Sequence, residues 1–246
     1  MLSALTKQQQ TEYRQKGYIT IQNFLTTAEI EQLCAECDRL KAQPDLFFQH
    51  IPEADVRRDI NGNPVRDRLD PVIHLSSIIR ELVHNVSLKA ILYSLFKGEP
   101  TLFKDKVIFK PPGTKGYDLH QDYAYWEQTG LPAHGVLSVQ VAIDSANAEN
   151  GAIVLYPGLH RSGRLPAPKN ALSDVCISAV EGVEPEVIAT QPGDILIFHS
   201  LTPHLSGINH SSQARRTLYL SYNASRYGDF YHSYYGNRLT TSSLSM

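Results

Sequence analysis

A histidine and an aspartate two positions apart are the first candidates for chemistry in this chain. His120 and Asp122 flank a single glutamine. On an extended segment, residues i and i+2 point to the same face, so this imidazole and carboxylate can bind one ion together. His204, just past a β-like run, is the candidate for a second imidazole. Two histidines and one carboxylate make the facial triad of non-haem iron(II) oxygenases, which leaves three metal positions for a co-substrate and dioxygen.

The residues around His204 favour this interpretation over a histidine of the core or of a turn. A His-x-Asp pair alone is weak evidence in a chain with ten histidines. However, Asp194 follows a Pro-Gly turn, His204 comes ten residues later, and Arg215 follows after eleven more. A 2-oxo dicarboxylate chelates iron through its 2-oxo acid end, and its far carboxylate needs a fixed cation. A guanidinium provides a bidentate fork for that carboxylate, and Ser206 could add a hydroxyl.

A simpler interpretation of Arg215 also stands. Arg215 and Arg216 could be two surface charges at the entrance of a strand. Because neighbouring strand residues face opposite sides, at most one of them points inward.

The first hundred residues must position this site, and they read mostly as helices. Thr6 caps a predicted helix through Lys16, which Gly17 ends. A short β-like run follows at Tyr18–Ile21. Thr26 and Glu29 form a capping box. The helix after it has one apolar face, made of Ile30, Leu33, Cys34, Cys37 and Leu40.

Residues 42–75 look irregular, which is typical of a functional loop such as a lid. Two short helices are predicted around Ser77–Asn85 and Ser87–Lys97. From about Pro100, short β-like runs alternate with Pro-Gly and Asn-Gly turns, which is typical of an all-β sandwich or barrel. These runs are Thr101–Phe109, Val136–Ile143, Ala152–Leu155, Glu186–Ala189, Ile195–His199 and Thr217–Tyr222.

We therefore expect a mainly β fold in which a helical N-terminal layer supports a β-core. The 246 residues fit one domain, with a mostly helical layer at 1–99, the core at 100–225 and a C-terminal tail at 226–246.

Composition limits the classes of partner. The formal net charge of −2 predicts neither nucleic-acid nor membrane binding. The polar N-terminus contains no apparent signal peptide, and no stretch approaches about 18 apolar residues. Three cysteines, an odd and low number, favour a reducing compartment, so we expect a cytoplasmic protein. We also expect a monomer or homodimer that acts on a small molecule.

The order of the motifs resembles the phytanoyl-CoA dioxygenase family of 2-oxoglutarate-dependent oxygenases. The resemblance runs from about Phe103 to Asn223, and the N-terminal pattern beginning at Tyr18 also resembles the family's opening. It is carried in order by Lys110-Pro-Pro-Gly, His120-Gln-Asp122, Glu149-Asn-Gly151, Tyr156-Pro-Gly-Leu-His160, Gly193-Asp194, His204-Leu-Ser-Gly-Ile-Asn209 and Arg215.

The resemblance implies a fold, cofactors and residue roles. The implied fold is a double-stranded β-helix, the cupin-like jelly roll, with flanking helices. Iron(II) is implied as the metal, with 2-oxoglutarate and O2 as co-substrates. By motif position, His120, Asp122 and His204 would bind the metal. The co-substrate contacts would be Arg215, Ser206, Lys106 and Gln140, although Gln140 departs from relatives with an aromatic residue there. Related halogenases have a small residue in place of the carboxylate ligand, so Asp122 favours hydroxylation.

The substrate is less well defined by the sequence. Tyr123, Tyr125 and Trp126 follow the metal motif and could line the substrate pocket, although a packed aromatic cluster is an equal alternative. Arg164 could meet an anionic substrate group near the mouth of the barrel. Four arginines of the irregular stretch could also meet an anionic substrate group, or they could form a charged face in contact with solvent: Arg57, Arg58, Arg66 and Arg68.

No basic cluster suited to CoA is evident, so a small polar metabolite or natural-product intermediate is favoured over an acyl-CoA. The alternatives are a non-catalytic jelly-roll binding protein, a cupin-type metalloenzyme that needs no 2-oxoglutarate, and an oxygenase that desaturates, epoxidises or closes a ring.

Overall fold

The structure, a computed structural model, describes residues 4–50, 56–169 and 174–236. Its centre is an antiparallel six-stranded sheet with the order β1-β9-β6-β11-β5-β4. These strands are β1 (Tyr18–Ile21), β4 (Arg68–Leu69), β5 (Pro100–Ile108), β6 (Val136–Ala142), β9 (Ile195–His199) and β11 (Thr217–Ala224).

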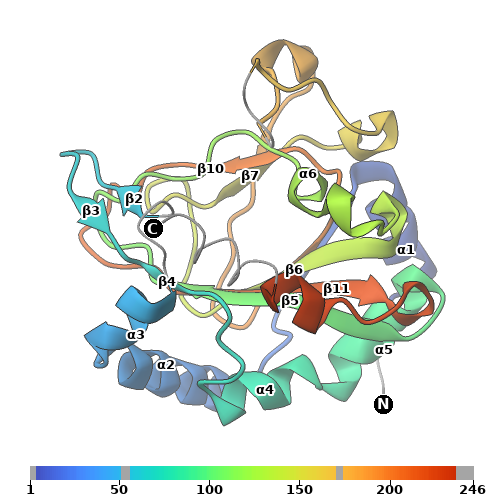
Figure 1. Ribbon diagram of the computed structural model, residues 1–246. Helices are drawn as coiled ribbons and strands as arrows, with labels where there is room; N and C mark the ends of the chain where they lie inside the picture. Colours follow the sequence, from blue (N-terminus) through green and yellow to red (C-terminus); the bar gives the residue numbers. More distant parts are fainter. Residues whose placement is uncertain (1–3, 51–55, 170–173, 237–246) are drawn as a thin grey trace.

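A second, three-stranded sheet with the order β10-β7-β8 faces the large one (Figure 1). It consists of β7 (Ile153–Leu155), β8 (Glu186–Val187) and β10 (His204–Ser206). Six apolar residues fill the space between the two sheets: Tyr18, Ile153, Leu155, Ile188, Leu196 and Phe198. The core is therefore mostly antiparallel sheet.

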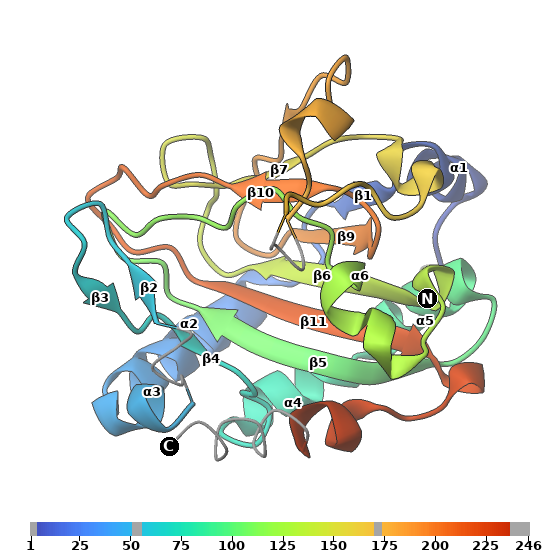
Figure 2. The ribbon, with the colours of Figure 1, turned by 45° about the horizontal axis from the view of Figure 1, so that its top comes forward.

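Helices cover the opposite face of the large sheet (Figures 1 and 2). Strand side chains alternate, so Val139 and Val141 of β6 and Leu218 and Leu220 of β11 point toward these helices. Leu33 of α2 belongs to the same buried cluster. These helices are α2 (Thr27–Lys41), α3 (Pro44–His50), α4 (Ser77–Val83) and α5 (Val86–Phe96). Helix α1 (Lys7–Lys16) packs beside β1, and α6 (Tyr123–Trp126) lies on the side of the small sheet (Figure 2). Short 3-10 turns occur at Glu127–Thr129, Ala133–Gly135, Leu159–Ser162, Ile177–Ala179 and Ser225–Tyr227.

The predicted starts of α1 and α2 and the predicted end of α1 are confirmed. Thr6 and Thr26 each accept from a main-chain N–H three residues on, in complete capping boxes. Gly17 ends α1 with a φ of 84°. A Cβ atom at this position would lie 2.4 Å from Nδ1 of His160, so both the backbone and the space require glycine.

Residues 42–75 are more regular than predicted. They contain α3, a two-stranded hairpin of β2 (Arg57–Arg58) and β3 (Pro64–Val65), and β4. The Asp59 carboxylate shapes the hairpin turn by accepting from the N–H groups of Asn61 and Asn63, each over 2.8 Å. Such local side-chain bonds leave no periodic pattern in the sequence. Residues 51–55 lie outside the described part.

The strand register sets two rows of side chains on the face of the large sheet that looks toward the small one. Gln140, Tyr219 and Lys106 are direct neighbours across β6, β11 and β5. Ser138, Ser221 and Lys104 form the next row, two residues along each strand. We call the first of these the inner row and the second the metal row. No helix of the described residues is long and apolar enough to cross a membrane.

Candidate active site

The three predicted metal ligands lie together. One ligand atom from each of His120, Asp122 and His204 lies within 4.8 Å of the others. Oδ1 of Asp122 is 3.7 Å from Nε2 of His120 and 3.8 Å from Nε2 of His204. Protein ligands bind divalent transition metals at about 2.0–2.2 Å, so atoms at these separations can share one ion. The donor set fits iron(II).

Main-chain pairing joins the two histidines. The N–H of His120 donates to the carbonyl of His204, and the N–H of His204 donates to the carbonyl of His120, each over 2.9 Å. Directly opposed residues of an antiparallel pair present their side chains on the same side, and the two ring centroids are 4.1 Å apart. His204 is the first residue of β10, whereas the sequence suggested a position just past a strand.

Asp122 reaches the same point from a helical turn, which corrects the prediction of an extended His-x-Asp segment. Its φ of −53° and ψ of −36° are helical, and α6 begins at the next residue. The N–H of Tyr123 donates to the carbonyl of Ser200 over 3.0 Å, which fixes this turn against the loop after β9. The carboxylate therefore meets the imidazoles because the chain turns, and not because strand residues alternate.

Main-chain carbonyls fix the tautomer of both imidazoles. Nδ1 of His120 is 2.7 Å from the carbonyl of Asp118, and Nδ1 of His204 is 2.9 Å from the carbonyl of Thr202. A carbonyl oxygen can only accept, so each Nδ1 carries the hydrogen and each Nε2 keeps its lone pair. Both lone pairs face Asp122. Metal-binding histidines are commonly oriented in this way.

The surroundings favour the protonation states that a metal requires. Burial, and then the neighbouring His120, lower the pKa of His204 to about 4, so His204 is neutral at pH 7. Burial alone would raise the pKa of Asp122, but the interactions with His120, His204 and Lys106 outweigh it and hold this pKa below its usual range. A neutral imidazole and an ionised carboxylate are the metal-binding forms.

Two residues that the sequence did not single out hold the ligands in place. The hydroxyl of Ser138 donates to Oδ2 of Asp122 over 2.8 Å. The amide of Gln121, 1% exposed, donates to the carbonyls of Leu201 and Gly163, and it accepts from the N–H of Leu165. Gln121 thus ties the metal loop to the segment just before His204.

The triad lies in the wall of a cavity of about 470 Å³. Four cationic side chains line this cavity together with three carboxylates outside the triad: Arg57, Arg68, Lys104 and Lys106, and Asp70, Asp118 and Asp174. Arg57 and Lys104 form ion pairs with Asp67 and Asp70. Arg57 and Arg68 belong to the stretch for which the sequence left open either substrate contact or a solvated face.

Two cations lie close to the ring of Tyr117 in the cavity wall. Nζ of Lys106 lies 5.1 Å from the ring centroid of Tyr117 and 5.2 Å from that of Tyr219. The guanidinium of Arg57 lies 4.5 Å from the Tyr117 centroid. Burial would raise the pKa of Tyr117, but the charges of Lys106, Arg57 and Arg68 lower it on balance. This concentration of positive charge suits an anion.

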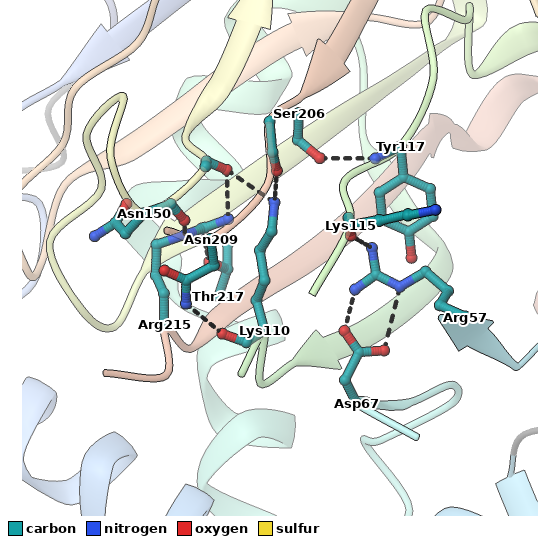
Figure 3. A network of polar contacts seen from close by, with 12 residues as sticks. Arg57, Asp67, Lys110, Lys115, Tyr117, Asn150, Ser206, Asn209, Arg215 and Thr217 are labelled. Atoms are coloured by element: carbon teal, nitrogen blue, oxygen red, sulfur yellow. Dashed lines mark hydrogen bonds and ion pairs between the residues drawn. The ribbon is translucent and has the colours of Figure 1, made fainter. Parts of the chain in front are cut away.

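Arg215 is buried and does not line this cavity; it lines a separate pocket together with Asn150 and Arg216. Its guanidinium donates to the carbonyls of Asn150 and Gly151, over 3.2 and 3.0 Å, and to the hydroxyl of Thr217. Lys110 donates to the carbonyls of Gly151 and Gly207. Figure 3 shows these two cations converging on the same loop, apart from Arg57 and Tyr117.

The other residues predicted to bind co-substrate or substrate take different positions. Ser206, Lys106, Tyr125 and Trp126 line the cavity. Gln140 is buried behind them and accepts from the hydroxyl of Tyr219 over 3.1 Å.

Two of the predicted substrate residues do not line the cavity. Tyr123 donates its hydroxyl to the carbonyl of Leu131, and Arg164 forms an exposed ion pair with Glu127.

The sequence analysis did not propose Tyr219, Tyr117 or Ser138 as site residues, and only Tyr219 has a signal in the sequence. Tyr219 lies four residues after Arg215 in a predicted strand, so it shares the face of Arg215. Tyr117 and Ser138 have no comparable signal, because their roles depend on contacts with Lys106, Arg57 and Asp122 from distant parts of the chain.

Comparisons with known proteins match most of this chain. A model of the family described as phytanoyl-CoA dioxygenase (PhyH) matches residues 13–217. The methylphosphonate hydroxylase of Gimesia maris is 33% identical over 242 residues, which cover 97% of this chain and 88% of that protein. The 2-aminoethylphosphonate dioxygenase of an uncultured bacterium is 24% identical, over 90% of this chain and 83% of that protein.

Solved structures share the fold. EctD from S. alaskensis, crystallised with 2-oxoglutarate and 5-hydroxyectoine, superposes with a TM-score of 0.74 at 18% identity, and the match covers 90% of this chain and 77% of EctD. The epimerase SnoN, crystallised with Fe3+, alpha ketoglutarate and nogalamycin RO, gives a TM-score of 0.73 at 21% identity over 89% of this chain and 83% of SnoN.

Proposed function

Because the chain belongs to the phytanoyl-CoA dioxygenase family and is an Fe(II)- and 2-oxoglutarate-dependent dioxygenase acting on a small molecule, we propose that it hydroxylates a C–H bond of a small anionic metabolite. The observation that carries the substrate class is the pair of cations, Lys106 and Arg57, on the ring of Tyr117 in the wall of the cavity of about 470 Å³ that also holds the triad. A small phosphonate is the first candidate, because a methylphosphonate hydroxylase is 33% identical to this chain.

We propose His120, Asp122 and His204 as the ligands of iron(II). Their Nε2, Oδ1 and Nε2 atoms converge, and their protonation states suit a divalent metal. When bound, iron supplies the redox chemistry that couples oxidation of 2-oxoglutarate to oxidation of the substrate. The balance is R–H + O2 + 2-oxoglutarate giving R–OH + succinate + CO2, so each oxygen atom of O2 enters one product.

We propose that 2-oxoglutarate extends from the triad along the inner row. Lys106 and Ser206 line the cavity there, and Gln140 braces Tyr219 from behind. Arg215 would hold the far carboxylate, since it lies on the same face of the β11 segment as Tyr219. A carboxylate is a stronger acceptor for a guanidinium than the neutral carbonyls of Asn150 and Gly151, so it can replace them.

The size of the cavity supports a small substrate. The same 470 Å³ must hold 2-oxoglutarate and substrate together, which argues against an acyl-CoA. Tyr125 and Trp126 line the cavity and are proposed substrate contacts, whereas Tyr123 and Arg164 are not carried forward. Desaturation, epoxidation or ring closure would use the same residues, so the product distinguishes these outcomes from hydroxylation.

We further propose that the two facing sheets form a double-stranded β-helix and that the whole chain is one domain. The buried cluster between the sheets and the helical layer under the large sheet support this arrangement. A monomer or homodimer in the cytoplasm stays a prediction.

The test is to incubate purified protein with Fe(II), ascorbate, O2 and 2-oxoglutarate, and to measure succinate and substrate products. The compounds are methylphosphonate, 2-aminoethylphosphonate, ectoine and an acyl-CoA. Succinate formed together with a hydroxylated phosphonate supports the proposal. Turnover of ectoine or acyl-CoA without turnover of either phosphonate contradicts the proposed substrate class. Lack of succinate with all compounds, together with binding of one of them, favours a non-catalytic binding protein.

A further inference from the structure

The C-terminal end of the described chain is fixed to the strand that carries Lys104 and Lys106. Residues 231–236 are helical and lie against β5 (Figure 2). The hydroxyl of Tyr231 donates to Oδ2 of Asp105 over 2.7 Å. The hydroxyl of Tyr235 donates to Oδ1 of Asp70 over 2.9 Å and accepts from the N–H of Asp105 over 3.1 Å. Both rings are buried, so two phenols anchor this helix.

Asp105 is the central anchor. It is fully buried and points away from the cavity, because side chains alternate along β5. Besides Tyr231, its carboxylate accepts from the N–H groups of Val72 and Ile73, over 2.6 and 2.8 Å. One buried carboxylate therefore joins the loop after β4 to the C-terminal helix. Buried carboxylates require such partners, so the position of the helix is strongly specified.

Tyr234, between the two anchoring tyrosines, lines the cavity that holds the metal triad. Its ring packs on Phe103, with centroids 4.9 Å apart, and Nζ of Lys104 lies 5.6 Å from its centroid. Lys104 pairs with Asp70, the same carboxylate that Tyr235 binds. The anchors of the helix thus also orient Lys104.

Lys104 shares a row of the large sheet with the serine that binds Asp122. It belongs to the metal row with Ser221 and Ser138, and Ser138 binds Asp122. The proposed co-substrate contact Lys106 belongs to the neighbouring inner row. Two of the four cations of the cavity therefore lie two residues apart on β5, which suits a reaction with two anionic reactants.

We propose that Tyr234 and Lys104 form the subsite for the anionic group of the substrate, and that Tyr231 and Tyr235 are positioning residues for it. This inference rests on the proposed function and adds the location of substrate binding. The Lys104 ammonium attracts a phosphonate or carboxylate, and the aromatic walls of Tyr234 and Trp126 exclude water and strengthen that attraction. The C-terminal helix thereby determines specificity.

The experiment is calorimetric titration of the anaerobic Fe(II)- and 2-oxoglutarate-loaded protein with methylphosphonate. We expect Tyr234→Ala and Lys104→Met each to raise the Kd for methylphosphonate by about tenfold or more. Tyr231→Phe should raise it less. All three should keep the visible charge-transfer band of the iron and 2-oxoglutarate complex, which shows that the fold and the co-substrate site are intact. Matched controls are Tyr93→Ala, an exposed tyrosine on α5, and Lys89→Met.

Unchanged methylphosphonate affinity in Tyr234→Ala and Lys104→Met would overturn the subsite. Lack of methylphosphonate binding by the wild-type protein with a normal charge-transfer band would overturn the anion assignment and leave the oxygenase function standing. Absence of the charge-transfer band in the wild-type protein would count against the proposed function. The affinity for methylphosphonate, measured in the variants, decides the subsite.

Discussion

Ser138 holds one oxygen of Asp122 and leaves the other to the two histidines. Its hydroxyl donates to Oδ2 over 2.8 Å, while Oδ1 faces Nε2 of His120 and Nε2 of His204. A carboxylate held in this way presents one oxygen to a metal. The inference that Asp122 binds iron through Oδ1 therefore depends on a residue 16 positions along the chain.

Replacing Ser138 should weaken metal binding without unfolding the protein. Ser138→Ala frees the carboxylate to rotate, and loss of such a partner commonly costs about 10- to 100-fold in metal affinity. The measurement is the Kd for Fe(II) under anaerobic conditions. Ser94→Ala is the control, because the Ser94 hydroxyl binds only a carbonyl within α5 among the described residues. Equal Fe(II) affinity in Ser138→Ala and wild type would show that the bond is incidental.

Arg215 and Lys106 should differ in how they affect 2-oxoglutarate. Lys cannot reproduce the bidentate fork of a guanidinium, so Arg215→Lys should raise the KM for 2-oxoglutarate by about tenfold or more. Lys106→Met should raise the same KM, because Lys106 lines the cavity wall near Tyr117 and Tyr219.

The two variants are compared in steady-state succinate assays at saturating iron. A raised KM in Lys106→Met with no change in Arg215→Lys would contradict the role proposed for Arg215. That result would make its bonds to Asn150, Gly151 and Thr217 purely structural.

Lys110 is expected to stabilise the loop around Arg215. It is 2% exposed and donates to the carbonyls of Gly151 and Gly207. Lys110→Met leaves both acceptors without this donor, so we expect a loss of about 1–3 kcal/mol in the free energy of unfolding. Denaturant titration of Lys110→Met and of Lys97→Met, at the exposed end of α5, measures the difference. Equal midpoints would refute the stabilising role.

His199 should make the protein lose stability in mild acid. Burial, and then the neighbouring His160, lower the pKa of His199 to about 4, whereas an unfolded histidine titrates near 6.5. Between these values the unfolded chain binds more protons than the folded one, so the free energy of unfolding falls as the pH drops from about 6.5 to about 4.

His199→Asn should reduce that fall, and it can keep an acceptor for the N–H of Leu201. Denaturant titrations of metal-free protein at pH 7.5 and pH 5 provide the measurement, with the exposed His210→Asn as control. An identical pH dependence in wild type and His199→Asn would assign the acid sensitivity to other groups.

The sequence predicted the elements well because their signals are local. The capping boxes at Thr6 and Thr26 and the apolar runs of strands β6, β9 and β11 follow from neighbouring residues. The hairpin of β2 and β3 was missed, since Asp59 shapes it through individual side-chain bonds that leave no period in the sequence.

The metal site was also predicted only in part, because residue types are visible in the sequence and tertiary contacts are not. His120, Asp122 and His204 have distinctive residue types in a recognisable order, and the structure brings them together. However, the reason for their proximity was wrong for Asp122, whose helical turn depends on the contact between Tyr123 and Ser200.

On the substrate side of the cavity, the sequence singled out Tyr125 and Trp126 but not the pair of Tyr234 and Lys104. Tyr234 and Lys104 are 130 residues apart and meet only because Tyr231 and Tyr235 dock on Asp105 and Asp70. Long-range contacts of this kind are decided by the tertiary fold, which a pattern of residue types does not contain.

The most direct test of the metal and co-substrate site is anaerobic titration of the purified protein with iron(II) and then 2-oxoglutarate, followed by visible absorption. A shared site made of His120, Asp122 and His204 predicts a charge-transfer band that saturates with one equivalent of each and is absent in Asp122→Ala. Lack of the band in the wild type, or an unchanged band and retained succinate formation in Asp122→Ala, would contradict it.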